Sequence, residues 1–220
     1  MAYIDFISAV HRSTRRDYLS RVVERPKAEL ARIARRYDRE YWDGDRSTGY
    51  GGYHYDGRWR PVADVMVKHY GLQPGDRVLD VGCGKAFLLY EFTLALPGAV
   101  VAGVDLSPYA LANTKKEIAP FVRLGNANRL PFPDKSFDLV ISINTIHNLY
   151  CYDAYAALQE IERVGRRHKY ICVESYRSEE EKVNLLYWQL TCEMFFNPDE
   201  WKWWFNHTGY TGDYSFMFFE

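Results

Sequence analysis

The stretch Arg77-Val78-Leu79-Asp80-Val81-Gly82-Cys83-Gly84-Lys85-Ala86 organises the whole chain, because it has the pattern of a buried strand that ends in a glycine turn. Val78, Leu79 and Val81 are residues that favour strands. Gly82 and Gly84 allow a tight turn and a close approach of the backbone to a ligand. An apolar helical pattern begins directly afterwards, at Phe87. Together these features predict a nucleotide-binding corner, because free backbone N–H groups point out of a helix N-terminus.

Two common nucleotide-binding patterns do not fit this corner. The dinucleotide fingerprint requires Gly or Ala at its third glycine position, where this chain has Phe87. A phosphate-binding P-loop requires Gly where Leu79 stands and Ser or Thr where Ala86 stands. The remaining signature is an acid, Asp80, two residues before the first glycine. An ordinary strand-to-helix turn stays open as the alternative interpretation.

Beyond residue 61, short apolar runs alternate with helical patterns. Strands are predicted near 77–81, 99–104, 120–124, 138–143 and 169–174. Helices are predicted near 86–95, 108–117 and 153–164. This alternation predicts an α/β fold with a doubly wound, mostly parallel sheet. Ligands of such sheets bind beyond the carboxyl ends of the strands, so the residues at these ends should share one rim.

Polar side chains stand at the ends of the predicted strands. Asp105 ends the second strand, and a carboxylate there can accept hydrogen bonds from the ribose hydroxyls of a nucleotide. The alternative is that Asp105 only starts the next helix, together with Ser107 and Pro108. Asn126 follows the third strand, and Asn144 lies at the end of the fourth.

Four motifs in order, over residues 62–174, resemble those of class I S-adenosylmethionine (SAM) dependent methyltransferases. They begin with Asp80-Val81-Gly82-Cys83-Gly84, in which Ala86 replaces the third glycine of the family pattern. The branch that the chain resembles contains quinone-biosynthesis and other small-molecule methyltransferases. The resemblance implies SAM as methyl donor and S-adenosylhomocysteine as product. The implied cofactor-binding residues are Asp80, Gly82, Cys83, Gly84, Asp105, Leu106, Asn126, Ala127 and Asn144.

The chain departs from the family pattern at two further positions. Asn126 stands where the family commonly has an acid that binds the adenine amino group, so we expect a weaker contact at that point. Methyltransferases that act on base amines often carry Asp/Asn/Ser-Pro-Pro-aromatic after the fourth strand. This chain has Asn144-Thr145-Ile146-His147 there, which argues against a nucleic-acid substrate.

The C-terminal part predicts one helix and one last strand. An apolar face over residues 178–196 follows an acidic start and predicts a helix. The family sheet usually has seven strands, but only one strand-like run, 214–219, remains after Gly209. This run is apolar on both faces, so we expect both faces to be covered and the sheet to be shortened. Its edge would need protection, which suggests a homodimer.

Two or three amphipathic helices are predicted over residues 3–40. Residues 41–60 then combine glycines with many large aromatic residues, a composition that does not suit a flexible linker. We interpret this segment as a lid over the active site, with a rigid structural loop as the alternative. The expected organisation is residues 1–60 as helices and lid, and residues 61–220 as the SAM-binding domain.

His147 is the first candidate for a general base, because it follows the fourth strand on the predicted rim. Its unperturbed pKa of about 6.5 would let it take a proton near neutrality. The alternative is that His147 only caps a local turn. Tyr53 and His54 are further catalytic candidates, because a closed lid could bring them to the same point. Methyl transfer from a sulfonium requires no metal, and we expect none.

A net charge of −1 gives no global attraction to nucleic acid or to anionic membranes. No run of about 18 apolar residues is present, so we expect a soluble, cytoplasmic protein without membrane association. The predicted function is methyl transfer from SAM to a small polar metabolite, guessed to be sugar-like or amino-acid-like. An RNA methyltransferase that uses the basic N-terminal helices and an inactive SAM-binding partner protein remain as alternatives. The sequence leaves the acceptor atom open.

Overall fold

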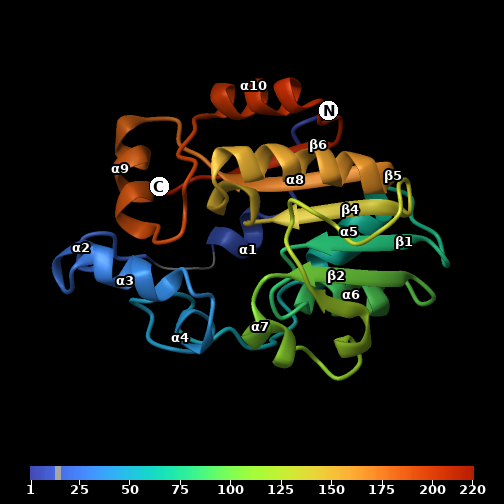
Figure 1. The fold of residues 1–220 in the computed structure, drawn as a ribbon, viewed down its shortest axis with the longest axis horizontal. Coiled ribbons are helices and arrows are strands. Elements are labelled where there is room, and N and C mark those ends of the chain that lie inside the picture. The colour runs from blue at the N-terminus through green and yellow to red at the C-terminus, as the bar shows by residue number, and fades with distance from the viewer. Residues whose placement is uncertain (13–15) are drawn as a thin grey trace.

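In the computed structural model, which describes residues 1–12 and 16–220, six strands form one sheet through the middle of the molecule (Figure 1). The strands are β1 Arg77–Val81, β2 Val100–Asp105, β3 Val122–Leu124, β4 Phe137–Ile143, β5 Gly165–Glu174 and β6 Asp213–Met217. Their order across the sheet is β3-β2-β1-β4-β5-β6, and every pair of neighbours is parallel. The predicted doubly wound α/β fold is therefore confirmed, and so is the shortened sheet.

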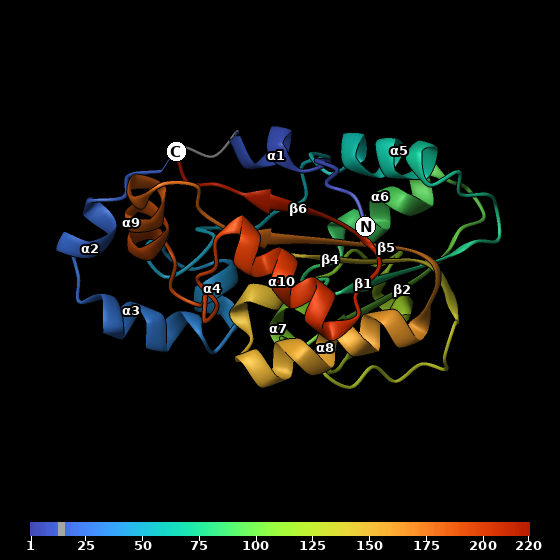
Figure 2. The ribbon, with the colours of Figure 1, turned by 90° about the horizontal axis from the view of Figure 1, so that it is seen from above.

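Helices cover both faces of the sheet. They are α1 Ser8–Arg12, α2 Ser20–Val23, α3 Lys27–Ala34, α4 Arg39–Trp42, α5 Arg60–His69, α6 Phe87–Ala95, α7 Pro108–Ala112, α8 Cys151–Val164, α9 Glu179–Trp188 and α10 Pro198–Thr208, with the short 3-10 turns η1 Ala119–Phe121 and η2 Ile146–Asn148. Figure 2 shows α1, α5 and α6 on one side of the sheet and α8 and α10 on the other. Successive side chains of β1 point to opposite faces of the sheet, which accounts for the helix layer on each face. Val78 packs toward α5 and α6, whereas Leu79 and Val81 pack toward α8 and α10.

Two predicted helices are shorter than expected. The helix predicted over 108–117 ends at Ala112, where the Asn113 side chain donates to the carbonyl of Tyr109. The helix predicted over 178–196 ends at Trp188, and the chain continues in an extended conformation from Gln189. The reason is a tertiary contact, because the N–H groups of Glu193 and Met194 both donate to the carbonyl of His147. The apolar residues after 188 thus pack as an irregular segment.

The last strand, β6, is covered on both faces as predicted, since Tyr214, Ser215, Phe216 and Met217 are all buried. Its outer edge is partly protected by the N-terminus of the same chain. Ile4 N–H donates to the carbonyl of Tyr214, and Tyr214 N–H donates to the carbonyl of Ala2. Edge protection therefore gives no specific support to a homodimer, which stays a prediction.

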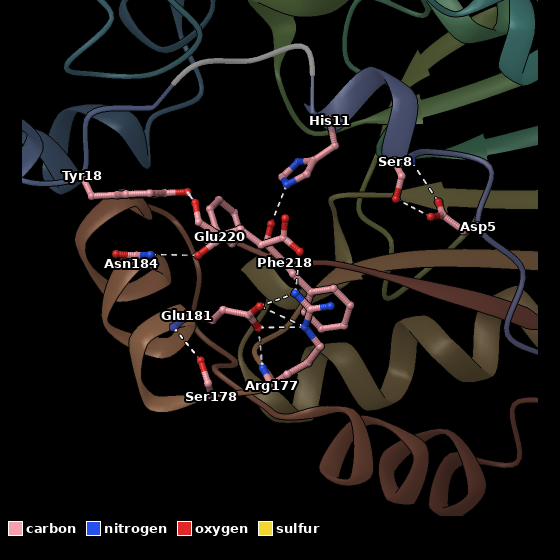
Figure 3. A network of polar contacts seen from close by, with 11 residues as sticks. Asp5, Ser8, His11, Tyr18, Arg177, Ser178, Glu181, Asn184, Phe218 and Glu220 are labelled. Carbon is pink, nitrogen blue, oxygen red and sulfur yellow. Dashed lines mark hydrogen bonds and ion pairs between the residues drawn. The ribbon is translucent and has the colours of Figure 1, made fainter.

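The helices α2, α3, α4 and α9 gather beyond the carboxyl ends of the strands (Figures 1 and 2). The C-terminal residues lie between this group and α1. Figure 3 shows the contacts: His11 Nε2 lies 2.8 Å from the carbonyl oxygen of Phe218, and the Tyr18 hydroxyl donates to the backbone carbonyl of Glu220 at 3.1 Å. Among the described residues, no helix has the length and apolar character needed to cross a membrane.

Candidate active site

The glycine turn between β1 and α6 is covered closely from two sides. Gly82 has φ +81°, and a Cβ added there would lie 1.9 Å from Thr145 Oγ1. Gly84 has φ +54°, and an added Cβ would lie 2.7 Å from the ring of Trp42. Ala86, which replaces the third glycine of the motif, also has a left-handed backbone, with φ +56°. Both glycines are therefore required by conformation and by the neighbours that press on the turn.

Asp105, at the end of β2, holds this turn in place. Its Oδ2 accepts from Gly84 N–H at 2.7 Å, and its Oδ1 accepts from Ser107 N–H at 2.8 Å. Burial raises the pKa of this carboxyl, against the effect of the backbone N–H groups. A carboxylate has about four lone-pair sites, so these two bonds leave acceptor capacity for a ligand. Asp105 thus has the structural role at the helix start that was the alternative interpretation. It also has lone pairs left for the predicted hydrogen bonds to a ribose.

A small cavity of about 130 Å³ lies at the carboxyl ends of the central strands. The predicted cofactor residues that line it are Gly82, Asp105, Leu106, Asn126, Ala127 and Asn144. Residues 41–60, the predicted lid, line it with Trp42 and Tyr50, whose rings are stacked with centroids 5.2 Å apart. Ligand pockets usually measure 300–1,000 Å³, so this cavity is smaller than a usual ligand pocket.

Three of the predicted cofactor residues do not line this cavity. Asp80 is buried at 5% exposure, and burial, with a smaller contribution from Asp105, raises the pKa of its carboxyl to about 7. Cys83 packs toward β2, since an added Cβ at Gly103 would lie 2.8 Å from its Sγ. Gly84 lies under the Trp42 ring. Asp80 and Cys83 thus support the turn from inside the protein, and Gly84 is covered by residues 41–60.

Asn144 has two features of a ligand-binding residue. It is a non-glycine residue with φ +57°, at the end of β4. Its Oδ1 is buried and has no hydrogen-bond partner in the described part of the chain. A buried acceptor without a partner is costly, and strained residues of this kind concentrate at functional sites. Asn144 lines the small cavity, and its contact with the cofactor stays a prediction.

A larger cavity of about 570 Å³ adjoins the small one. The two share Tyr41, Tyr50, Asn144 and Asn148 as wall residues. All three predicted catalytic residues, His147, Tyr53 and His54, line the larger cavity. The rest of its wall comes from the N-terminal part of the chain between Val10 and Arg21, from residues 41–60, from the ends of β5 and β6, and from Trp188 and the irregular segment after it.

His147 lies in η2 and is buried, with 1% exposure. Its Nδ1 accepts from Glu174 N–H at 3.2 Å, which assigns the ring proton to Nε2, and Nε2 lies 3.3 Å from Glu174 Oε2. Burial lowers the pKa of His147 to about 3. The ring is therefore neutral near pH 7, contrary to the expected proton uptake at a pKa of about 6.5. This environment favours a positioning role.

Glu174 is a candidate that the sequence interpretation did not include. It ends β5, is 4% exposed and lines the larger cavity. Its Oε1 accepts from the Gln189 side chain, and its Oε2 has no hydrogen bond in the described residues. Burial raises the pKa of the Glu174 carboxyl to about 8. The signal was present in the sequence, because Glu174 ends an apolar strand as Asp105 does.

The side chains of the other two catalytic candidates, Tyr53 and His54, differ in how firmly hydrogen bonds hold them. The Tyr53 hydroxyl accepts from Trp59 Nε1 at 2.8 Å, and the Tyr53 N–H donates to Asp43 Oδ1 at 3.1 Å. His54 is exposed on the lid. Tyr53 is thus fixed within the lid, and His54 keeps a ring that can meet a ligand.

The predicted lid is docked on the glycine turn through Asp43. Lys85 Nζ donates to Asp43 at 2.7 Å and to the Tyr53 carbonyl at 2.8 Å, and Tyr109 donates its hydroxyl to Asp43 at 2.8 Å. Burial opposes ionisation of Asp43, but these hydrogen bonds keep its pKa below the usual value. Trp42 Nε1 also donates to Ser107 Oγ at 3.0 Å. The lid and the turn are therefore one connected network.

Comparison with known proteins agrees with this geometry. Residues 79–173 match a protein family described as a methyltransferase domain. Residues 79–173 therefore form a methyltransferase domain. This family takes its methyl group from SAM. A demethylmenaquinone methyltransferase from Lysinibacillus sphaericus is 34% identical to this chain over 131 residues, which cover 55% of this chain and 52% of that protein. The chain thus matches about half the length of this relative.

Two solved structures share the fold of the methyltransferase domain. The YcgJ protein from Bacillus subtilis superposes with a TM-score of 0.52 at 22% identity, over 66% of each chain. The [4+2]-cyclase SpnF also superposes with a TM-score of 0.52, at 18% identity, over 71% of this chain and 61% of that one. The second match illustrates that this fold by itself does not determine the reaction.

Proposed function

We propose that this chain transfers a methyl group from SAM to a small polar acceptor held in the larger cavity. The observation that carries the proposal is the wall that the two cavities share. Asn144 and Asn148 line both the cavity at the glycine turn and the polar cavity beside it. A donor bound in the first and an acceptor bound in the second would therefore meet at Asn144.

The residues present fit the cofactor. Gly82, which has a positive φ, borders the small cavity with its backbone, and the partnerless Oδ1 of Asn144 offers an acceptor. Asp105 would hold the ribose, Asn126 and Ala127 would border the adenine, and Asn144 would hold the amino-acid end. In this proposal, residues 61–220 bind the cofactor, and residues 1–60 choose the acceptor together with the C-terminal residues that line the larger cavity.

When bound, SAM supplies an electrophilic methyl group for in-line displacement by the acceptor's nucleophile, with the S–C electron pair returning to sulfur. The chain's own residues align the acceptor and exclude water. In its ionised form, whose fraction grows as the pH rises toward its pKa of about 8, Glu174 takes the proton that the nucleophile loses, because its Oε2 has no hydrogen bond from the described residues and it lines the acceptor cavity. The neutral His147 positions Glu174, since its Nδ1 and Nε2 both face that residue.

The acceptor class can be argued from the walls of the cavity. The relative from Lysinibacillus sphaericus is named for demethylmenaquinone, which makes a quinone-type acceptor the second candidate. A quinone of that kind is largely apolar. The cavity combines aromatic and apolar side chains with many arginine, histidine, asparagine and acidic side chains. This lining supports a small polar acceptor, sugar-like or amino-acid-like, over a quinone.

The test is a methyl-transfer assay with labelled SAM and the full chain. Three acceptor pools are offered separately: polar metabolites, an apolar extract that contains quinols, and RNA. We expect label in the polar pool and formation of S-adenosylhomocysteine. Label in the apolar pool or in RNA would replace the proposed acceptor by that class. Binding of SAM without label in any pool would make the chain a SAM-binding protein without transferase activity.

A further inference from the structure

Three guanidinium groups surround one tryptophan in a part of the larger cavity that the small cavity at the glycine turn does not share. Trp188 is the last residue of α9. The guanidinium carbon of Arg21 lies 4.6 Å from the Trp188 ring centroid, that of Arg46 lies 5.1 Å away, and that of Arg16 lies 5.5 Å away. All four side chains line the cavity. Stacking on an aromatic face holds a guanidinium by its plane and leaves its N–H edge available.

Neither Arg21 nor Arg46 is neutralised by a carboxylate. Arg21 Nε donates to the Trp188 carbonyl at 3.1 Å, and its Nη1 donates to the Arg46 carbonyl. Arg46 Nη1 donates to the carbonyl of Tyr50 at 2.7 Å. In the described part of the chain, no acidic side chain lies within ion-pair distance of either residue. Each therefore keeps N–H donors for a ligand.

The acidic residues of the cavity do not compensate for this charge. Asp56 is already paired with Arg58, at 2.6 Å. Glu174 has a pKa raised to about 8 by burial, so it is largely protonated at neutral pH. Arg21 is 9% exposed, and burial followed by the charge of Arg46 lowers its pKa to about 10, against smaller opposite effects of Tyr41 and Asp45. Like charges held together without a counter-ion are unfavourable, and a bound anion would relieve this.

We propose that the methyl acceptor carries an oxyanion, a carboxylate or a phosphate-type group, which binds to Arg21 and Arg46 beside Trp188. This inference rests on the proposed function. The free N–H donors of two guanidinium groups suit the paired oxygens of such a group. With the anion held there, the rest of the acceptor extends through the cavity toward Asn144, where its nucleophile is needed. Arg16 contributes to the same positive part of the cavity.

The experiment measures anion binding to the full chain without any acceptor. Inorganic phosphate and acetate are titrated at constant ionic strength against chloride, with thermal unfolding and calorimetry as readouts. We expect at least one of the two anions to bind and to raise the melting temperature. Tighter binding of phosphate would assign a phosphate-type acceptor, and tighter binding of acetate would assign a carboxylate. The absence of any effect beyond that of chloride would overturn the proposal.

Variants connect the binding to the arginines. Arg21→Gln and Arg46→Gln should each weaken anion binding at least fivefold, whereas Arg46→Lys should retain part of it. The matched control is Arg60→Gln, because Arg60 pairs with Asp64 on α5, outside the cavity. Equal anion affinity in the parent and both glutamine variants would leave the arginines as packing for Trp188 and overturn the proposal. S-adenosylhomocysteine affinity, measured on the same samples, verifies folding and tests the proposed function separately.

Discussion

Two regions of the molecule are built in different ways: the rim at the strand ends, which includes the glycine turn, and the larger cavity proposed for the acceptor. Most of the rim consists of residues at strand ends, and the parallel sheet brings these ends together once the strands form. The cavity joins segments that are far apart in the chain, such as Arg21, Tyr50, His147 and Trp188. This difference suggests that the two regions have separate roles: the rim determines which cofactor binds, and the cavity determines which acceptor binds.

The largest effect should follow from damage to the rim. In Gly82→Ala, the new methyl group would lie 1.9 Å from Thr145 Oγ1 at a backbone φ of +81°. The strain and overlap should reduce the free energy of unfolding by about 2–4 kcal/mol, measured by denaturant titration. Gly75→Ala is the control, since Gly75 has φ +93° and nothing within 4 Å of an added Cβ. Equal losses in the two variants would mean that Thr145 does not constrain the turn.

A substitution in the acceptor cavity should lower the rate of turnover. Glu174→Gln keeps the size of the side chain and removes its ability to take a proton, so we expect turnover to fall about 10²–10⁴-fold. S-adenosylhomocysteine affinity should remain within a fewfold, because Glu174 lines only the larger cavity. In the parent, kcat/KM should rise with pH toward about 8, as the buried carboxyl loses its proton. Parental turnover in the variant would remove Glu174 from the mechanism.

The same residue should make stability depend on pH. The pKa of Glu174 is raised from 4.5 to about 8 in the folded chain, so between these values the folded state binds more protons than the unfolded state. The free energy of unfolding should therefore fall as pH rises through this window. Glu174→Gln should remove a decline of order 3 kcal/mol between pH 5 and pH 8, measured by denaturant titration. An unchanged slope would mean that Glu174 is ionised in the folded chain.

A smaller effect is expected where the two regions meet. Asp43→Asn weakens the contacts from Lys85 and Tyr109 that dock the lid on the turn. Amide hydrogen exchange in residues 41–60 should become about 5–20-fold faster, in line with a loss of 1–2 kcal/mol of local stability. Asp64→Asn, which removes an exposed ion pair with Arg60, should leave this exchange unchanged. Slow exchange in both variants would show that aromatic packing alone holds the lid.

The smallest effect concerns the departure at Asn126. Asn126→Asp restores the acid that the family commonly has there, and Asn126 lines the small cavity. A carboxylate is a stronger acceptor than an amide for the adenine amino group, so calorimetry should give about two- to fivefold tighter binding of S-adenosylhomocysteine. Weaker binding would mean that the adenine lies away from this residue.

The comparison also explains what could be predicted from the sequence. Strand runs and the glycine turn depend on local patterns, so β1 was predicted with its observed bounds and six of the nine cofactor candidates line one cavity. Long-range contacts are invisible to such patterns. The end of α9 at Trp188 depends on bonds between His147 and the segment that follows. The low pKa of His147 and the high pKa of Glu174 depend on burial, which only the folded chain provides.

Binding of S-adenosylhomocysteine to the parent chain and to Asp105→Ala, measured by calorimetry, tests the central claim most directly. Asp105 lines the small cavity and holds the glycine turn through Gly84, so we predict at least tenfold weaker binding in the variant. Asp76→Ala is the control, because Asp76 directly precedes β1, at the end of the strand opposite the predicted site, and should leave the affinity unchanged. Equal affinity in the parent and Asp105→Ala, or no binding to the parent, would contradict the assignment of this rim as the cofactor site.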